Sequence, residues 1–368
     1  MTVVERRKDP AGVLAPAGPD PTGRPAWWRR PFPRYVLRRL GSSALILLGV
    51  TLVAFLLTTV VPADPATANL GQRALSDPET VQRFREHYGL DRPLPLQYLT
   101  YLGNLLRGDF GQSQQTLRPV SQDLLQFAPA TLELVLSATL VALLVGVLCG
   151  VAAARRRGGW FDRIARLSSL TGVSLPIFWI ALVASVVFFR GLRLLPGSGR
   201  LDPALVKPPQ VTGFLTVDSL LAGDWHAFGS AVSHLVLPSA VLAISVVGMV
   251  LRFTRTAVLE ALGTDFVKAA RAKGLRERDV LWGYAVRFAF GPLVTATTLS
   301  FGFMLAATVY VEQQFSWGGI GQYAYRSSTN LDLSAVMGVS IVIALVFVLI
   351  NLAADLLYAL FDPRIRLR

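Results

Sequence analysis

The sequence predicts an all-α protein with about six membrane-crossing helices, and three observations lead to this fold class. Hydrophobic residues make up 52% of the 368 residues, and the mean hydropathy is +0.48, which is too apolar for an ordinary soluble domain. The apolar residues form separate runs of about 20, the length that a helix needs to cross a bilayer. Of the 36 Lys and Arg, 25 fall in segments that the topology below places on the inner side, as the positive-inside rule requires.

The N-terminal segment, residues 1–34, is rich in Pro, Gly and Arg and has no apolar periodicity, so we expect a disordered cytoplasmic tail. Residues 35–368 then form one transmembrane domain. Its first span is expected at Leu40–Val61, with arginines before it on the inner side. The polar residues 62–127 that follow predict a small extracytoplasmic subdomain. Short helices are expected there at Glu79–Tyr88 and, on the membrane surface, at Leu96–Leu106.

The second span is expected at Thr131–Ala153, where Gly146 and Gly150 form a small-xxx-small pattern that lets helices approach closely. The third span is expected at Ile164–Phe189, with Pro176 removing a backbone hydrogen bond and kinking it. The sequence leaves open whether this kink is a structural bend or a hinge that lines a pathway.

Three further spans complete the predicted topology, with both termini in the cytoplasm. They are expected at Leu235–Leu251, Leu293–Val309 and Leu333–Leu360, and Pro238 is expected in the first turn of the fourth. Long outer loops connect the third span to the fourth and the fifth to the sixth.

Residues 252–291 form a cytoplasmic loop with eight Lys or Arg against four acidic residues. Thr264 and Asp265 predict a helix start, alanines follow, and Gly274 predicts the stop. A second short helix fits Glu277–Ala289. We therefore expect two short helices that offer a surface to a partner.

Several kinds of chemistry are missing from the sequence. It contains no G-x-x-x-x-G-K-[ST] nucleotide loop, no H-E-x-x-H and no G-x-S-x-G. The three histidines, His87, His226 and His234, form no close cluster, which argues against a metal site, and the single Cys149 allows no internal disulfide. The net charge of +13 follows the topology, so we expect no nucleic-acid partner.

Four acidic or amide side chains lie within or at the ends of apolar runs. Asn351 and Asp355 share one face of the last span. Buried charge in a membrane is costly, so Asp355 either lines a pathway or, near the inner surface, reaches water or pairs with a neighbour. We favour the structural role over the pathway, and we interpret Glu133 and Glu312, near the outer surface, in the same way.

Several short motifs follow one another along the chain. They are Arg38-Arg39-Leu40, Pro62-Ala63-Asp64-Pro65, Tyr88-Gly89-Leu90-Asp91-Arg92-Pro93-Leu94-Pro95, Gly108-Asp109-Phe110-Gly111-Gln112-Ser113, Ser174-Leu175-Pro176-Ile177-Phe178-Trp179, His234-Leu235-Val236-Leu237-Pro238, Asp355-Leu356-Leu357-Tyr358 and Asp362-Pro363-Arg364. In this order, the motifs resemble those of the permease subunits of binding-protein-dependent ABC importers, in the dipeptide, oligopeptide and nickel branch (B-type permease). The resemblance runs from Tyr35 to Arg366.

The resemblance implies that the cytoplasmic loop carries the coupling motif of the family, the EAA motif. The residues that would couple to the ATPase are Asp265, Lys268, Ala269, Ala270, Arg271, Lys273 and Gly274. The sequence departs from the family pattern at Lys268, in place of a glutamate, at Tyr284 and Phe288, in place of His and Asn, and in Trp317-Gly318-Gly319, in place of W-P-G.

The resemblance also implies the partners. A second homologous permease subunit would complete the pore, two ATP-binding cassette subunits would bind ATP and Mg, and an extracytoplasmic protein would deliver substrate. This chain would be a multi-pass protein of the cytoplasmic membrane, in contact with lipid, without a cofactor and without enzymatic activity of its own. Di- or oligopeptides are the expected cargo, with nickel, glutathione or another small solute as alternatives.

Two other classes of function remain as hypotheses. An intramembrane enzyme would have to use Ser174 and His234, although the glycine expected after the serine is missing. A self-sufficient secondary carrier would predict inverted internal repeats, and we find none in the sequence. Activity or transport by the isolated chain would favour these alternatives.

Overall fold

The structure is a computed structural model that describes residues 31–60, 77, 79, 82 and 92–361. Nearly all of the expected N-terminal tail, most of the expected helix at Glu79–Tyr88 and the C-terminal motif Asp362-Pro363-Arg364 lie outside these residues. The described residues are predominantly helical and contain no strand, only the isolated bridge between Gln112 and Pro119. This confirms the predicted all-α class.

Five of the described helices are long and apolar enough to cross a membrane, so the protein is a multi-pass membrane protein. Their apolar runs were each predicted from the sequence, but most of the helices extend well beyond the predicted runs. They are α1 (Pro31–Val60), α6 (Val120–Arg155), α10 (Trp225–Leu262), α14 (Phe290–Phe315) and α16 (Leu333–Phe361).

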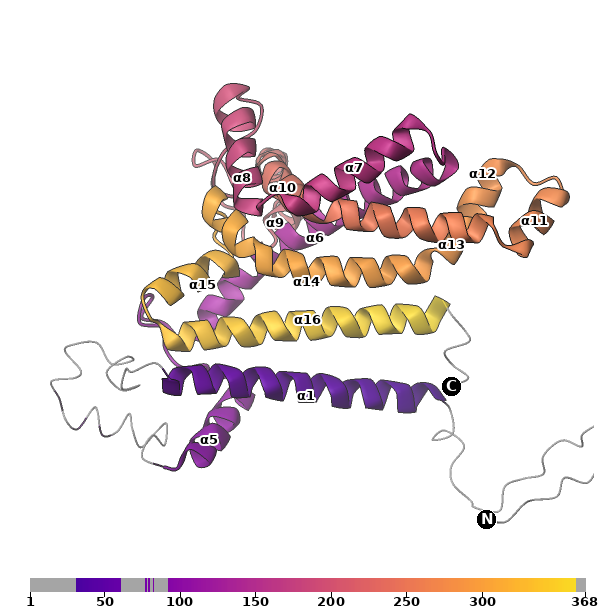
Figure 1. The fold of residues 1–368 in the computed structure, drawn as a ribbon. Helices are drawn as coiled ribbons and strands as arrows, with labels where there is room; N and C mark the ends of the chain where they lie inside the picture. The colour runs from indigo at the N-terminus through magenta and orange to yellow at the C-terminus, as the bar shows by residue number, and fades with distance from the viewer. Residues whose placement is uncertain (1–30, 61–76, 78, 80–81, 83–91, 362–368) are drawn as a thin grey trace, which may run out of the picture.

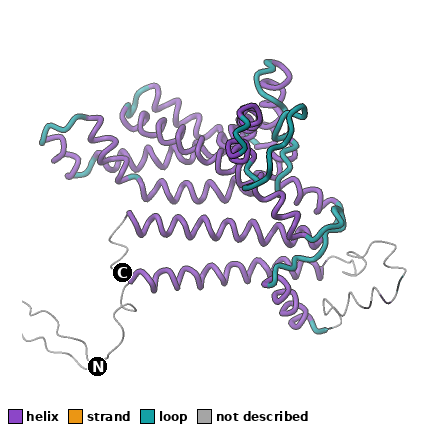
Figure 2. Tube along the Cα trace, turned by 180° about the vertical axis from the view of Figure 1, so that it is seen from behind, coloured by secondary structure: helices purple, strands orange, loops and turns teal. Residues whose placement is uncertain are grey.

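The long helices lie side by side, with α10 packed against α6 and α14 (Figure 1). Helix α16 lies beside α14, and α1 packs on α16 at the edge of the bundle. The start of α1, the end of α16 and helices α11 (Asp265–Ala272) and α12 (Glu277–Asp279) gather at one end, on the right in Figure 1 and on the left in Figure 2. We call this the basic end.

The opposite end, which we call the loop end, carries three short helices. They are α5 (Leu94–Leu106), α9 (Leu215–Leu221) and α15 (Ile320–Thr329). Helix α5 packs on α1, where the Tyr98 and Thr51 hydroxyls lie 2.9 Å apart and the Tyr98 and Phe55 rings 5.5 Å apart. The predicted helix at Leu96–Leu106 is thereby confirmed.

The third predicted span is broken rather than kinked, which corrects the expectation of one continuous helix. Helix α7 (Trp160–Ser174) ends just before Pro176, and α8 (Ile177–Ala184) then continues into a π-helical turn, Ser185–Gly191. Pro176 is extended, with ψ of 130°, and a proline also disfavours helical geometry in the residue before it. Helix α8 therefore runs steeply across the direction of α10 and α14 in Figure 1.

The fourth span also begins earlier than predicted. Asp224 caps α10 by accepting a hydrogen bond from the Ala227 backbone N–H at 2.9 Å. Pro238 consequently lies inside the helix, not in its first turn. Because neighbouring helices restore lost bonds, membrane helices tolerate such prolines.

Glycines set the closest helix contacts. A Cβ on Gly146 would lie 2.7 Å from Val250 Cγ1, and one on Gly150 would lie 2.6 Å from Thr254 Cβ. The predicted small-xxx-small face of α6 therefore packs against α10, as expected. On another side of α10, Gly248 admits the Ser169 backbone of α7 in the same way.

Candidate functional site

A helical hairpin, residues 265–288, lies at the basic end (Figure 1). It consists of α11, α12, a π-helical turn (Val280–Ala285) and α13 (Val286–Phe288). The predicted start at Asp265 and the predicted stop near Gly274 are confirmed. Gly274 has φ of +76°, a conformation that side chains disfavour. The sharp turn between the two arms of the hairpin depends on this glycine.

The first residues of the expected cytoplasmic loop do not belong to this hairpin. Residues 252–262 continue α10 without interruption. In the same way, residues 120–127 of the expected extracytoplasmic subdomain form the first turns of α6. Both helices therefore project beyond the apolar runs that predicted them.

One face of α11 packs against the rest of the hairpin. Val267 and Ala270 are buried with Val280 in a small core that Leu262 completes. Ala270 therefore supports the hairpin from within, whereas Ala269 is exposed. The two alanines, predicted to act together, have different surroundings.

The opposite face of α11 carries exposed charges. Lys268 pairs with Asp265 at 2.9 Å, and Arg271 pairs with Glu277 through contacts of 2.8 and 3.3 Å. The second pair joins the two arms of the hairpin, while Lys273 is exposed beside Gly274. Exposed pairs of this kind contribute about 0–1 kcal/mol each. A partner with acidic groups can therefore replace them at little cost.

The hairpin also exposes five large apolar side chains, which we call the apolar patch. Its side chains are 37% to 44% exposed, and the Phe266 and Phe288 rings lie 5.9 Å apart. Exposed aromatic residues close to basic ones are typical of protein interfaces. Sequence reasoning missed this patch, although the concentration of aromatics in so polar a loop was a signal. The patch consists of Phe266, Leu275, Trp282, Tyr284 and Phe288.

The hairpin is attached firmly to α10. Leu281 and Ala285 are buried against Ala257, Val258 and Ala261 of α10. This core extends into α6 and α14. A force on the hairpin is therefore transmitted to the long helices rather than absorbed by a flexible loop.

A buried carboxylate joins α7 to α10 near the same end. The Asp162 side chain, 1% exposed, accepts hydrogen bonds from Arg255 at 2.5 and 3.0 Å and from the Gly158 backbone N–H at 3.0 Å. Such bidentate pairs fix direction as well as distance. Displacement of α10 is thus coupled to α7.

The two polar residues of the last span have local partners. Asp355 forms an ion pair with Arg39 of α1, and Asn351 donates a hydrogen bond to the Phe347 carbonyl of its own helix at 2.7 Å. Of the two structural roles expected for Asp355, contact with water or pairing, the structure shows pairing. His234, considered above for an enzyme, lies 2.8 Å through Nδ1 from the Ser230 carbonyl of its own helix. The side chain of Ser174 lies outside the described residues.

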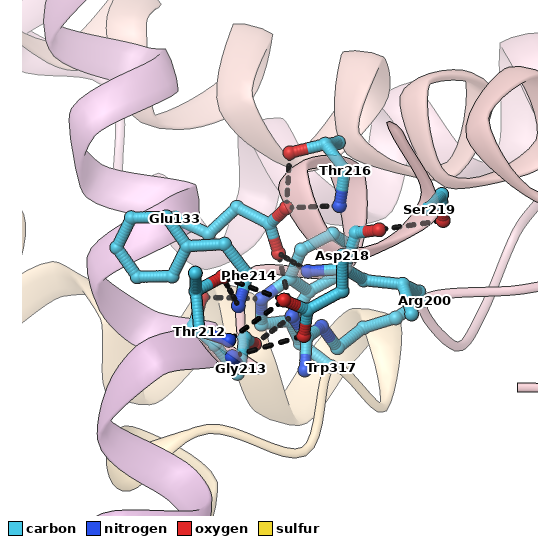
Figure 3. A network of polar contacts seen from close by, with 11 residues as sticks. Glu133, Arg200, Thr212, Gly213, Phe214, Thr216, Asp218, Ser219 and Trp317 are labelled. Carbon is cyan, nitrogen blue, oxygen red and sulfur yellow. Dashed lines mark hydrogen bonds and ion pairs between the residues drawn. The ribbon is translucent and has the colours of Figure 1, made fainter. Parts of the chain in front are cut away.

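At the loop end, Glu133 is the centre of a buried polar network (Figure 3). Its carboxylate accepts a hydrogen bond from Arg200 at 2.5 Å and from the Thr216 backbone N–H at 2.8 Å. Arg200 also donates to the Gly213 carbonyl at 3.1 Å, and its guanidinium lies 5.7 Å from the Trp317 ring centre. Glu133 therefore holds the start of α9 and the preceding loop against α6.

Asp218 organises the loop before α9 (Figure 3). Its carboxylate accepts hydrogen bonds from the Thr212 backbone at 2.7 Å and the Gly213 backbone at 2.9 Å. Burial alone would raise the pKa of Asp218, but the hydrogen bonds from Thr212 and Gly213 lower this pKa below its usual value. The carboxylate is thus ionised throughout the neutral range.

Glu312 is the centre of a second buried polar cluster, on the side of α15. It accepts hydrogen bonds from Thr131 Oγ1 at 2.5 Å and the Gln322 backbone at 2.9 Å, and Thr131 accepts one from the Ile320 backbone at 2.8 Å. A Cβ on Gly319 would lie 2.4 Å from Thr131 Oγ1. The structural interpretation of Glu133 and Glu312 is thereby confirmed. Sequence reasoning missed Arg200, which lies in a loop without a motif, and Asp218, which lies in the short helix α9.

Two family models match most of the chain. Residues 32–135 match the N-terminal family described as "Binding-prot-dependent transport system membrane comp, N-term" and residues 146–367 match "Binding-protein-dependent transport system inner membrane component". The solved methionine transporter MetNI, in an inward-facing form, aligns with 63% of this chain and 93% of its own, at 16% identity and a TM-score of 0.46.

The chain is also similar to curated permeases over nearly its whole length. It is 41% identical to the probable D,D-dipeptide transport system permease protein DdpB of Escherichia coli K12, over 89% of this chain and 96% of the relative. It is 40% identical to the di/tripeptide permease DppB of Pseudomonas aeruginosa, over 90% and 98%. The chain therefore belongs to the family of inner membrane components of binding-protein-dependent transport systems.

Proposed function

We propose that this chain is the permease subunit of an ATP-driven importer for di- and oligopeptides, located in the cytoplasmic membrane. The relatives above are peptide permeases by name, and they align with nearly all of the chain. The observation that carries the coupling part of the proposal is the helical hairpin. It presents exposed aromatics and cations, and it is packed on α10 through its buried face.

The proposed topology places the basic end in the cytoplasm and the loop end outside. The hairpin and the loop after α6, with Arg155–Arg157, are rich in cations, and basic loops remain in the cytoplasm. Both termini are then cytoplasmic. Residues 35–368 act as the transmembrane domain, and the part of residues 62–127 before α6 acts as an extracytoplasmic subdomain.

In the proposed assembly, a second homologous permease completes the pathway and two ATP-binding cassette subunits supply the ATP and Mg sites. One of them receives the hairpin, with Lys268, Arg271 and Lys273 facing its acidic groups and Ala269 allowing close approach. Asp265 and Gly274 maintain the shape of the hairpin. An extracytoplasmic binding protein delivers the peptide to the loop end.

The path of coupling follows from the packing of the helices. Closure of the ATPases displaces the hairpin, which moves α10 through Leu281 and Ala285. Helix α10 has 38 residues and therefore reaches about 57 Å at 1.5 Å per residue. It carries the displacement to the loop end, while the Asp162–Arg255 pair transmits it to α7. ATP binding thus biases the two states of a packed helical body.

Reconstitution of the chain with its ATPases, second permease and binding protein tests the proposal. ATP-dependent uptake of a radiolabelled dipeptide is expected, and uptake of nickel or glutathione without uptake of any peptide would replace the substrate assignment. Uptake or catalysis by the chain alone would contradict the permease assignment and favour a carrier or an enzyme.

The Gly274→Val variant tests the hairpin directly. Its positive φ is unfavourable for a β-branched residue, so we expect loss of ATP-driven uptake with normal membrane insertion. Gly108→Val at the loop end is the matched control, because Gly108 has φ of +81° and open space around it, as Gly274 does. Full uptake by Gly274→Val, or equal loss in both variants, would contradict a role for the hairpin.

A further inference from the structure

A cleft of about 880 Å³ opens at the loop end, apart from the helical hairpin and the Glu133 network. One wall is formed by the end of the π-helical turn and the segment that follows, and the other by the start of α10. A volume of this size is within the range of small-ligand sites. The polar side chains that line it are Arg190, Arg193, Asp202, Ser230, Ser233 and His234.

Two arginines form one side of the cleft. Within the described residues, neither Arg190 nor Arg193 has an ion-pair partner. This distinguishes them from Arg39, Arg200 and Arg255, which pair with carboxylates. The backbone is also irregular here, with a π-helical turn at Arg190 and φ of +51° at Arg193. Two exposed guanidinium groups on one cleft attract an anion, and a carboxylate suits their planar shape.

The opposite side of the cleft carries a buried histidine with one ring nitrogen engaged. His234 is 8% exposed, and its Nδ1 lies 2.8 Å from the Ser230 carbonyl, to which it donates. This bond makes Nε2 the acceptor of a neutral imidazole, because a ring nitrogen that donates to the backbone fixes the tautomer, and His234 is among the residues that line the cleft. Asp202 comes from the segment after the π-helical turn and is held next to α10, because its backbone N–H donates to Ser230 Oγ at 3.0 Å. Its carboxylate is exposed and adds a negative group to the cleft.

The wall that bears the arginines is held in place by several contacts. The Leu194 backbone N–H donates to the Phe188 carbonyl at 2.9 Å, and the Gly199 backbone N–H donates to the Phe315 carbonyl at 2.8 Å. A Cβ on Gly197 would lie 2.3 Å from the Phe189 ring, so this glycine lets the segment fold onto the π-helical turn. The cleft is therefore preformed, which lowers the cost of binding.

We propose that this cleft binds a short peptide through its two charged termini before translocation. Arg190 and Arg193 bind the C-terminal carboxylate, Asp202 binds the N-terminal ammonium, and His234 Nε2 bonds to the peptide group between them. The proposal rests on the proposed function, since it assigns a recognition site to the same permease. It predicts that free termini, rather than side chains, are recognised here.

The test measures binding to the full-length chain in nanodiscs of neutral phosphatidylcholine, by saturation-transfer NMR. The probes are alanyl-phenylalanine, its C-terminal amide and its N-acetyl derivative. We expect at least tenfold weaker binding of each derivative than of the free dipeptide. Equal binding of the dipeptide and its amide would overturn the proposal.

The variants assign this selectivity to the cleft. Arg190→Gln/Arg193→Gln is expected to lose at least tenfold in affinity for the free dipeptide and to bind the amide as the unmodified chain does. Arg107→Gln/Arg118→Gln, with two exposed arginines outside the cleft, is the matched control and should bind normally. Asp202→Asn should bind the N-acetyl derivative unchanged. A cleft variant that binds the dipeptide as tightly as the control would overturn the proposal.

A lipid headgroup is the other source of an anion for this cleft. If the cleft variant loses binding of phosphatidylglycerol but not of the dipeptide, the cleft is a lipid site and the proposal fails. The assay needs no ATPase, so its outcome is separate from the proposed function. Peptide uptake by a complex that carries the cleft variant, at the normal half-saturating concentration, would contradict only the assignment of the cleft. Dipeptide binding without any ATP-driven uptake would contradict only the proposed importer function.

Discussion

The two ends of the molecule handle charge in opposite ways. At the loop end, Glu133 and Glu312 are almost fully buried, and each accepts several hydrogen bonds from its own chain. In the hairpin at the basic end, Lys268 and Arg271 are exposed and have single partners close in sequence. The contrast teaches that the buried acids Glu133 and Glu312 stabilise the fold. The exposed cations Lys268 and Arg271, in contrast, can exchange their partners for acidic groups of another protein.

The largest expected effect is a difference in stability between a variant at the loop end and a variant at the basic end. Glu133→Ala leaves Arg200 without its carboxylate and removes the acceptor for the Thr216 backbone, at a cost of about 3–5 kcal/mol. Glu277→Ala, which removes the exposed partner of Arg271, is the control and should cost under about 1 kcal/mol. Thermal unfolding of the purified chain in detergent measures both. Similar unfolding temperatures for the two variants would break the comparison.

A second variant tests how tightly the loop end is packed. Gly319→Ala places a methyl group 2.4 Å from Thr131 Oγ1 and 2.5 Å from Glu312 Oε1, so one of them has to move. Overpacking of this kind costs about 1–3 kcal/mol. Gly103→Ala is the control, because Gly103 has open space around it and, like Gly319, no positive φ. If Gly319→Ala unfolds at the same temperature as the control variant, close packing at Gly319 does not contribute to stability.

A charge swap in the hairpin tests whether Arg271 acts only within the hairpin, by pairing with Glu277, or also contacts a partner protein. Arg271→Glu/Glu277→Arg restores an ion pair across the hairpin but reverses the charge that α11 presents. Stability should change by under about 1 kcal/mol, whereas ATP-driven uptake should fall several-fold because acidic groups on the ATPase would face a glutamate. Normal uptake by the swapped chain would show that only the internal pair matters.

The smallest effect is a pH dependence at the loop end. Because the folded state lowers the pKa of Asp218, its contribution to stability is complete above the unfolded pKa, about 3.9. It is lost as pH falls below that value and through the folded pKa. Hydrogen exchange at the Thr212 and Gly213 backbone, corrected for intrinsic rates, should be constant from pH 7 to 5 and increase below about 4. Asp218→Asn should abolish this increase, and a rise already at pH 6 would assign it to another group.

Apolar length, charge asymmetry and glycine placement were enough to predict much of this protein. Runs of about 20 apolar residues predicted the long helices because a bilayer admits little else. Thr264, Asp265 and Gly274 predicted the first helix of the hairpin because capping and positive φ are local properties. Gly146 and Gly150 predicted a close helix contact, since their spacing alone places them on one face.

The tertiary structure decided what depends on residues far apart in the chain. The partners of Glu133 lie between residues 200 and 216, and loops of this kind have no periodicity that would place them beside α6. The break at Pro176 depends on how α8 packs against α10 and α14, because a membrane proline either kinks or ends a helix according to its neighbours. Local chemistry therefore determined which segments cross the membrane, and long-range packing determined which charges are buried, which are exposed and where a cleft opens.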